Sequence, residues 1–173
     1  MDFDIVEKDA ICLAGMTSYG TVSGKEWNED NFIGGLWKRF MEYWMKNIDT
    51  FEFKPINPDT MYEVTVWDEE GLKVHSFSTF VGVMVESFDS VPFELETKML
   101  PANKYAFLTL KGRDIVGWQS GFYNEDIPKS GHRVYTSKGY GYEIVAYEKD
   151  RFYGLGKEEL EKSEIDVYVP LSL

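Results

Sequence analysis

One pattern of apolar and polar positions occurs twice along the chain. Residues 61–70 read Met-Tyr-Glu-Val-Thr-Val-Trp-Asp-Glu-Glu, and residues 141–150 read Gly-Tyr-Glu-Ile-Val-Ala-Tyr-Glu-Lys-Asp. The two stretches match nearly position for position, with Glu63 over Glu143 and Trp67 over Tyr147. Their alternation of β-branched or aromatic residues with polar ones predicts a strand in each half of the chain.

The second of these strands places an acid among aromatic residues. Successive side chains of a strand point to opposite faces, so Glu143, Val145 and Tyr147 share one face. Such a face can meet a flat, apolar and positively charged molecule. A solvated face is the alternative. Glu63, the equivalent of Glu143 in the first half, could be a second anion in the groove or a solvated face residue, and we favour the solvated residue.

A helical period covers residues 27–47, where apolar side chains recur at spacings of three and four. These positions are Phe32, Leu36, Phe40, Tyr43 and Trp44. Asn28 or Asp30 is expected to cap the start of this helix. Trp37 and Met41 flank the stripe and could face a site instead of the core. A shorter helix carrying Trp118 and Phe122 is predicted in the second half, with Asp114 as its cap.

Further strands are predicted at residues 11–16, 75–86, 104–110 and 165–169. Each half therefore reads strand, helix, strand, strand. We predict an α+β fold in which two βαββ units, at about residues 1–90 and 91–173, form one domain with pseudo-twofold symmetry, an antiparallel sheet and two main helices. The concave site is expected on the pseudo-dyad between the halves.

Composition narrows the function. The 173 residues include 12 Phe, 11 Tyr and 5 Trp, enough to line a site as well as a core. Thirty acids against 18 bases give a net charge of −12, which disfavours nucleic acid and favours cationic ligands or basic proteins, although acidity also serves solubility alone.

Neither a metal nor a cofactor is expected. The single Cys12 lies in an apolar run, and His75 and His132 lie in different halves without a spaced acid or cysteine. The sequence shows no glycine-rich phosphate motif before a helix. It also shows no apolar stretch of the length that a membrane span requires and no signal-peptide pattern, so a cytoplasmic protein without membrane contact is expected.

The chain resembles the GyrI-like, AraC-type effector-binding (SOUL-like) domains over essentially its whole length. Four stretches carry the resemblance: residues 100–107 (Leu-Pro-Ala-Asn-Lys-Tyr-Ala-Phe), residues 126–131 (Asp-Ile-Pro-Lys-Ser-Gly), the strand with Tyr142-Glu143, and residues 165–170 (Ile-Asp-Val-Tyr-Val-Pro). The chain departs from the family pattern at Asn103, where Gly is usual, at Asp126, where Trp is usual, and at Val145, where Tyr is usual. The order and spacing of the four stretches carry more weight than any one of them.

The resemblance implies a binding domain for amphipathic organic molecules, often cationic, with Glu143 as the buried acid. In transcription regulators such a domain is fused to a DNA-binding helix-turn-helix. Here the resemblance begins within the first dozen residues and ends at the C-terminus, so a stand-alone domain is expected. The candidate ligand-binding residues are Glu143, Tyr147, Trp67, Trp118, Phe107 and Tyr62.

Three function classes stay open, in this order. The first is a non-catalytic binder of amphipathic, cationic small molecules. The second is a hydrolase, because some members of the family hydrolyse cyclopropane-bearing electrophiles with a Glu. The third is an acidic protein-interaction module of the gyrase-inhibitor type, with a protein partner or a homodimer. No catalytic residue is assigned, because no catalytic constellation other than Glu143 is apparent.

Overall fold

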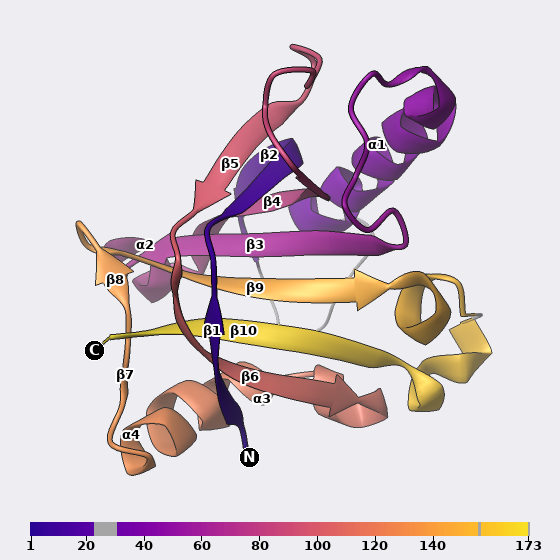
Figure 1. The fold of residues 1–173 in the computed structure, drawn as a ribbon. Coiled ribbons are helices and arrows are strands. Elements are labelled where there is room, and N and C mark those ends of the chain that lie inside the picture. The colour runs from indigo at the N-terminus through magenta and orange to yellow at the C-terminus, as the bar shows by residue number, and fades with distance from the viewer. Residues whose placement is uncertain (23–30, 156, 173) are drawn as a thin grey trace.

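The protein, represented by a computed structural model, is described over residues 1–22, 31–155 and 157–172 (Figure 1). Its strands form one antiparallel sheet in the order β1-β6-β10-β9-β3-β4-β2-β5, with β7 and β8 paired beside β10 and β9. The strands are β1 (Asp4–Lys8), β2 (Ile11–Thr21), β3 (Thr60–Asp68), β4 (Ser76–Val85), β5 (Glu96–Leu100), β6 (Asn103–Lys111), β7 (Arg133–Val134), β8 (Thr136–Ser137), β9 (Tyr140–Glu148) and β10 (Glu164–Ser172).

Helical segments connect the strands. The α-helices are α1 (Phe32–Asn47), α2 (Glu69–Lys73), α3 (Trp118–Gly121) and α4 (Ile127–Lys129). Shorter 3₁₀ or π segments are η1 (Ile48–Thr50), η2 (Gly112–Ile115), η3 (Phe122–Asp126), η4 (Lys149–Tyr153) and η5 (Lys157–Lys162). Beyond the predicted elements, the structure adds β1, β5 and the short strands β7 and β8.

Both predicted helix caps are wrong. The Asn31 side chain caps α1, because it accepts hydrogen bonds from the backbone N–H groups of Ile33 (3.0 Å) and Gly34 (2.9 Å). Asn28 and Asp30, the predicted caps, lie outside the described residues. Asp114 falls within the 3₁₀ turn η2, and α3 begins only after Gly117, whose φ of 74° places it in the left-handed region that favours glycine.

The predicted α+β fold with two βαββ units and pseudo-twofold symmetry is confirmed. The first half contributes β2, α1, β3 and β4, and the second contributes β6, α3, β9 and β10. The sheet order reads the same from both ends when the halves are exchanged, with β3 and β9 side by side at its centre. Val64 and Ile144, which are equivalent positions of the repeated pattern, pair with each other. The pseudo-dyad therefore passes between these two residues.

The opening strand of each half pairs with the other half. β1 precedes β2 but pairs with β6, and β5 precedes β6 but pairs with β2. Only two residues separate β1 from β2, although these strands lie at opposite ends of the sheet order. So short a link spans only a few ångströms per residue, so the two ends of the sheet must curl toward each other. The crossed pairing of β1 with β6 and of β5 with β2 therefore joins the two halves.

Helices cover one face of the sheet, and a separate buried cluster lies on the opposite face. One buried cluster packs α1 on β2 and β4, with Leu36, Phe40 and Trp44 from the helix. A second packs Trp118, Phe122 and Ile127 on β6, β9 and β10. A third lies on the opposite face, where Tyr105 and Tyr142 join their hydroxyls at 3.0 Å. Between the two helix-packed clusters, β3 and β9 continue the same face of the sheet, and we call this part the helix face of β3 and β9.

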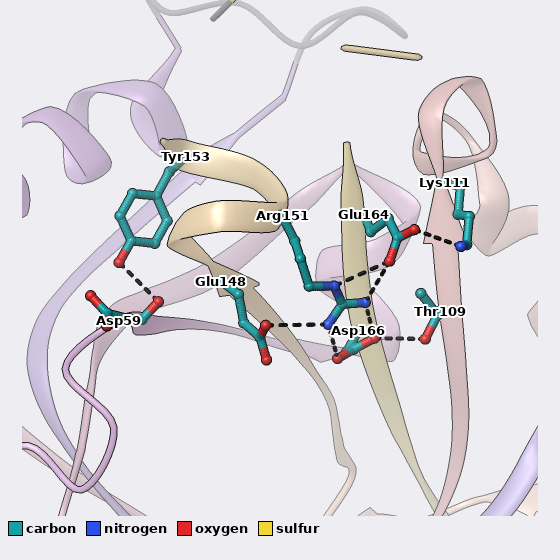
Figure 2. Close-up of polar contacts among 8 residues, drawn as sticks. All are labelled: Asp59, Thr109, Lys111, Glu148, Arg151, Tyr153, Glu164 and Asp166. Carbon is teal, nitrogen blue, oxygen red and sulfur yellow. Dashed lines mark hydrogen bonds and ion pairs between the residues drawn. The ribbon is translucent and has the colours of Figure 1, made fainter. Parts of the chain in front are cut away.

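An arginine cluster fixes the segment that follows β9 (Figure 2). The guanidinium of Arg151 in η4 binds Asp166 on β10, with Nη1 to Oδ2 at 2.7 Å and Nη2 to Oδ1 at 3.0 Å. It also donates from Nε to Glu164 at 3.1 Å and lies 3.6 Å from Glu148. Because η4 is held against β10, the neighbouring Phe152 is positioned over β9, where its ring packs on Tyr147.

The close pairing of β2 and β4 depends on glycine. A Cβ on Gly15 would lie 2.0 Å from the carbonyl oxygen of Val81 and 2.6 Å from Cα of Gly82. We expect Gly15→Ala to lower the free energy of unfolding by about 3 kcal/mol, because only backbone movement relieves these contacts. The matched control is Gly35→Ala on α1, where a Cβ meets nothing within 4 Å and should add about 0.5–1 kcal/mol. Urea unfolding measures both, and a Gly15→Ala protein as stable as the wild type would contradict this packing.

Candidate functional site

The candidate site lies on the helix face of the central pair β3 and β9. Glu63 pairs with Val145, and Glu143 pairs with Thr65, so the two acids are diagonal neighbours one residue on either side of the pseudo-dyad. Both side chains point to the helix face. Each acid directly precedes Val64 or Ile144, whose side chains point to the opposite face, and successive side chains of a strand alternate between the two faces. The repeated sequence pattern thus brings its two acids together.

Glu143 is a buried acid held by the second half. Its side chain belongs to a residue that is only 7% exposed, and its Oε2 accepts a hydrogen bond from the Tyr123 hydroxyl at 2.6 Å. Burial raises its pKa from 4.5 to about 7, opposed by hydrogen bonds from Tyr123 and Gln119 and reinforced by the negative charge of Glu63. Glu143 is therefore only partly ionised at neutral pH.

Glu63 is not a solvated residue, contrary to the sequence-based interpretation. It is half-buried, and its Oε2 accepts a hydrogen bond from the indole Nε1 of Trp37 at 2.5 Å. Burial raises the pKa of Glu63, and the Trp37 hydrogen bond acts against that rise. The prediction failed because Trp37 lies on a helix that no local pattern places over β3.

Aromatic rings wall the two acids on both sides of the pseudo-dyad. On one side, the Trp37 ring meets Tyr147 edge-on at 5.2 Å between centroids, and Tyr147 packs on Phe152 at 4.8 Å. On the other, the Trp67 ring meets Tyr123 edge-on at 5.8 Å. Partial exposure of the Trp37, Trp67 and Tyr147 residues shows that these walls are not sealed from solvent.

The Tyr147 phenol responds to both acids. Burial raises its pKa well above the ordinary value of 10.0, and the negative charges of Glu63 and Glu143 raise it further. The phenol is therefore neutral at any physiological pH. Together with the indoles, it offers the acids a wall of rings and no opposite charge.

No basic side chain of the described residues forms an ion pair with Glu63 or Glu143. The chemical consequence is a pair of acids whose ionisation is disfavoured by burial and would be favoured by a nearby positive charge. The described part of the chain holds no cluster of three or more His, Cys, Asp or Glu residues that could hold a metal ion. Among the described helices, none is long and apolar enough to cross a membrane.

The structure places four of the six predicted site residues on this face. Glu143 and Tyr147 lie beside the pseudo-dyad, Trp67 contacts Tyr123, and Trp118 is buried behind Tyr123 at 6.1 Å between ring centroids. Whether they bind a ligand stays a prediction.

Tyr62 and Phe107 lie away from the other four. Tyr62 precedes Glu63 on β3, so its side chain points to the face opposite the helices, where it packs in the cluster of Tyr105 and Tyr142. Phe107 alternates with the buried Ala106 and Leu108, and its ring packs on Tyr168 at 5.0 Å.

Three residues around the acids were not among the predicted ligand-binding residues. Trp37, which donates to Glu63, was expected to flank the helical stripe and could also face a site. Tyr123, which donates to Glu143, and Phe152, which packs on Tyr147, gave no local signal. An open depression of about 490 Å³ adjoins Tyr123 and is otherwise lined by Ile127, Pro128, Gly131, His132, Arg133 and Val134. It contains neither acid, so the site is assigned to the β3–β9 face instead.

The raised pKa of Glu143 makes stability depend on pH. Between pH 4.5 and about 7 the folded state retains a proton that the unfolded state has lost, so this group's contribution is complete below pH 4.5 and declines as the pH rises through 7. Glu143→Gln removes the dependence. Relative to the wild type, its free energy of unfolding should rise by about 3 kcal/mol from pH 4.5 to pH 8.

Urea unfolding at the two pH values measures this difference. Glu42→Gln, at an exposed acid of α1, is the matched control and should show no comparable change. A Glu143→Gln difference that is constant with pH would mean that Glu143 titrates normally in the folded protein.

Comparison with solved structures shows the same fold in several proteins. The chain is 13% identical to SAV2435, whose structure contains bound tetraphenylphosphonium, with a TM-score of 0.66 over 99% of this chain and 94% of that one. The C-terminal domain of EcmrR gives 10% identity and 0.65 over 99% and 97%. An integron cassette protein from the mobile metagenome of Vibrio cholerae gives 12% identity and 0.55 over 98% and 95%.

A search of curated proteins gives no match. The family model that describes integron-associated effector binding proteins, Cass2, matches residues 4–171. The predicted resemblance to GyrI-like effector-binding domains is confirmed, and this chain belongs to the Cass2 family of integron-associated effector binding proteins.

Proposed function

We propose that this effector-binding domain binds an amphipathic organic cation over the β3–β9 pair, with Glu143 as its counter-charge. The observation that carries the proposal is the pair of desolvated acids without a basic partner among the described residues. A buried carboxylate is costly unless it is neutralised or paired, and a bound cation would compensate that cost.

The surrounding rings favour an organic cation over a bare ion. Trp37, Trp67 and Tyr147 stand beside the acids, and a cation over an aromatic face gains roughly 0.5–2 kcal/mol, depending on its desolvation. A strongly hydrated ion would forgo these apolar contacts. The net charge of −12 would also attract cations at long range. The tetraphenylphosphonium in SAV2435 is a ligand of this class and supplies a probe.

The test is calorimetric titration with tetraphenylphosphonium and with neutral triphenylphosphine oxide. We expect Glu143→Gln to weaken the phosphonium at least about tenfold, because it removes a desolvated counter-charge, and to leave the neutral oxide within about twofold. Glu42→Gln is the matched control and should change neither affinity. Absence of phosphonium binding to the wild type, or equal weakening of both compounds, would contradict the proposal.

A hydrolase is the second candidate, because a pKa of about 7 suits a general base at neutral pH. In that case Glu143 would take a proton from water while the water oxygen bonds to a carbon of a strained cyclopropane. The ring C–C bond at that carbon would break, and the released carbon would take up a proton. Glu143→Gln should then abolish product formation, followed by chromatography, while binding of the uncharged electrophile persists. Undiminished turnover in the variant would remove Glu143 from the mechanism.

A further inference from the structure

We propose that the ligand class of this site is an aromatic dication, with two cationic groups separated by about one aromatic ring. The inference rests on the proposed function and narrows it. The site presents two acids, Glu63 and Glu143, at equivalent positions of the two halves. A molecule with one cationic group at each end matches that arrangement.

Strand geometry sets the spacing of the two cationic groups. Diagonal neighbours on adjacent antiparallel strands lie about 7–8 Å apart, with their Cβ atoms somewhat closer, and Glu63 and Glu143 are such neighbours. Glutamate side chains have two further carbons before the carboxylate, so the carboxylates can adjust to a spacing of this size. Two ammonium groups in para positions of a benzene ring, each through one methylene, are separated by a similar distance.

Each acid has its own supporting residues. Trp37 donates to Oε2 of Glu63, and its ring meets Tyr147 edge-on. Tyr123 donates to Oε2 of Glu143, and its ring meets Trp67 edge-on. The pseudo-dyad therefore relates two half-sites, each with one acid, one hydrogen-bond donor and one neighbouring ring.

The acid of each half-site also retains lone pairs that can interact with a ligand. A carboxylate accepts about four hydrogen bonds, whereas Glu63 accepts one from Trp37, and Glu143 accepts those from Tyr123 and Gln119. The remaining lone pairs of both acids can face a cation without breaking the contacts to Trp37 and Tyr123. Binding therefore does not require the walls to be dismantled.

Charge balance separates a dication from a single cation. One positive charge leaves the second acid uncompensated, and that acid must then keep its proton or share the cation with the first. Two positive charges neutralise both acids at once. Because the two groups are linked, the second contact forms at high effective concentration and adds to the affinity of the first.

The probes are 1,4-bis(trimethylammoniomethyl)benzene and its isosteric monocation, in which one quaternary nitrogen is replaced by carbon as a neopentyl group. Both carry permanent charges, so their protonation does not change with pH. Titration is made calorimetrically at pH 8, above the pKa of Glu143. We expect the dication to bind the wild type at least about tenfold more tightly than the monocation.

Glu63→Gln tests the second acid. It keeps an oxygen for the Trp37 hydrogen bond, and it should bring the affinity for the dication down to that for the monocation while changing the monocation's affinity less than about threefold. Circular dichroism and melting check that the variant folds. If it does not fold, the comparison of the two probes in the wild type decides the question alone.

Proton release gives an independent readout at pH 7. Titration in two buffers of different ionisation enthalpy counts the protons displaced from the acids, and the dication should displace more than the monocation, because it lowers the pKa of both carboxyl groups. Equal release by the two probes would indicate that only one acid meets a charge.

The outcomes separate this inference from the proposed function. A monocation that binds through Glu143, with no gain for the dication and no effect of Glu63→Gln, overturns the dication and leaves the proposed function intact. A cation shared between both acids would appear as a monocation weakened by either substitution, and it also overturns the dication. Failure of both probes and of tetraphenylphosphonium overturns both proposals.

Discussion

The register between β3 and β9 is the constraint on which the site depends. It pairs Val64 with Ile144 and thereby places Glu63 and Glu143 on the same face, one on either side of the pseudo-dyad. A slip of one residue in this register would turn one acid to the face opposite the helices and separate the pair. Gly141 helps this register, because a Cβ there would lie 2.8 Å from Nε1 of Trp67. The indole thus lies directly over β9 and extends the wall to Tyr123.

The crossed pairing of β1 and β5 explains how two neighbouring acids, Glu63 and Glu143, persist in a folded protein. Like charges on neighbouring strands destabilise the pairing between them, here at the junction of the two halves. β1 and β5 each bind the half to which they do not belong by sequence, so separation of the halves would also break these two pairings. The fold therefore holds the acids together with strands that lie far from them. In that arrangement a ligand that neutralises the acids would stabilise the folded state.

The twofold symmetry of the candidate site could be predicted from the sequence better than the residues that form it. The repeat with Tyr62-Glu63 and Tyr142-Glu143 supported the prediction of two βαββ units, and strand alternation correctly placed Glu143 and Tyr147 on one face. Alternation also argues against Tyr62, which should have been excluded as a neighbour of Glu63. Tyr123 and Phe152 could not be found, because tertiary packing of η3 and η4 brings Tyr123 to Glu143 and Phe152 to Tyr147. The sequence left Trp37 open between core and site, and only the packing of α1 brings it to Glu63. That packing also half-buries Glu63, so its environment was equally beyond the reach of local sequence.

The pair of Glu63 and Glu143 differs from the acids that surround Arg151 in the same molecule. On β9, β10 and η4, three acids gather around Arg151, and Lys111 binds one of them at 2.5 Å (Figure 2). Burial opposes ionisation of Asp166, yet the hydrogen bonds and charge of Arg151 keep the pKa of that acid below its usual value. At Glu63 and Glu143 burial also acts, but indole and phenol donors offset it only in part, and both pKa values rise. The fold thus pairs acids with bases where it needs a rigid anchor. Beside the pseudo-dyad it surrounds two acids with rings instead, an arrangement that costs stability in isolation and that a ligand's own charge would complete.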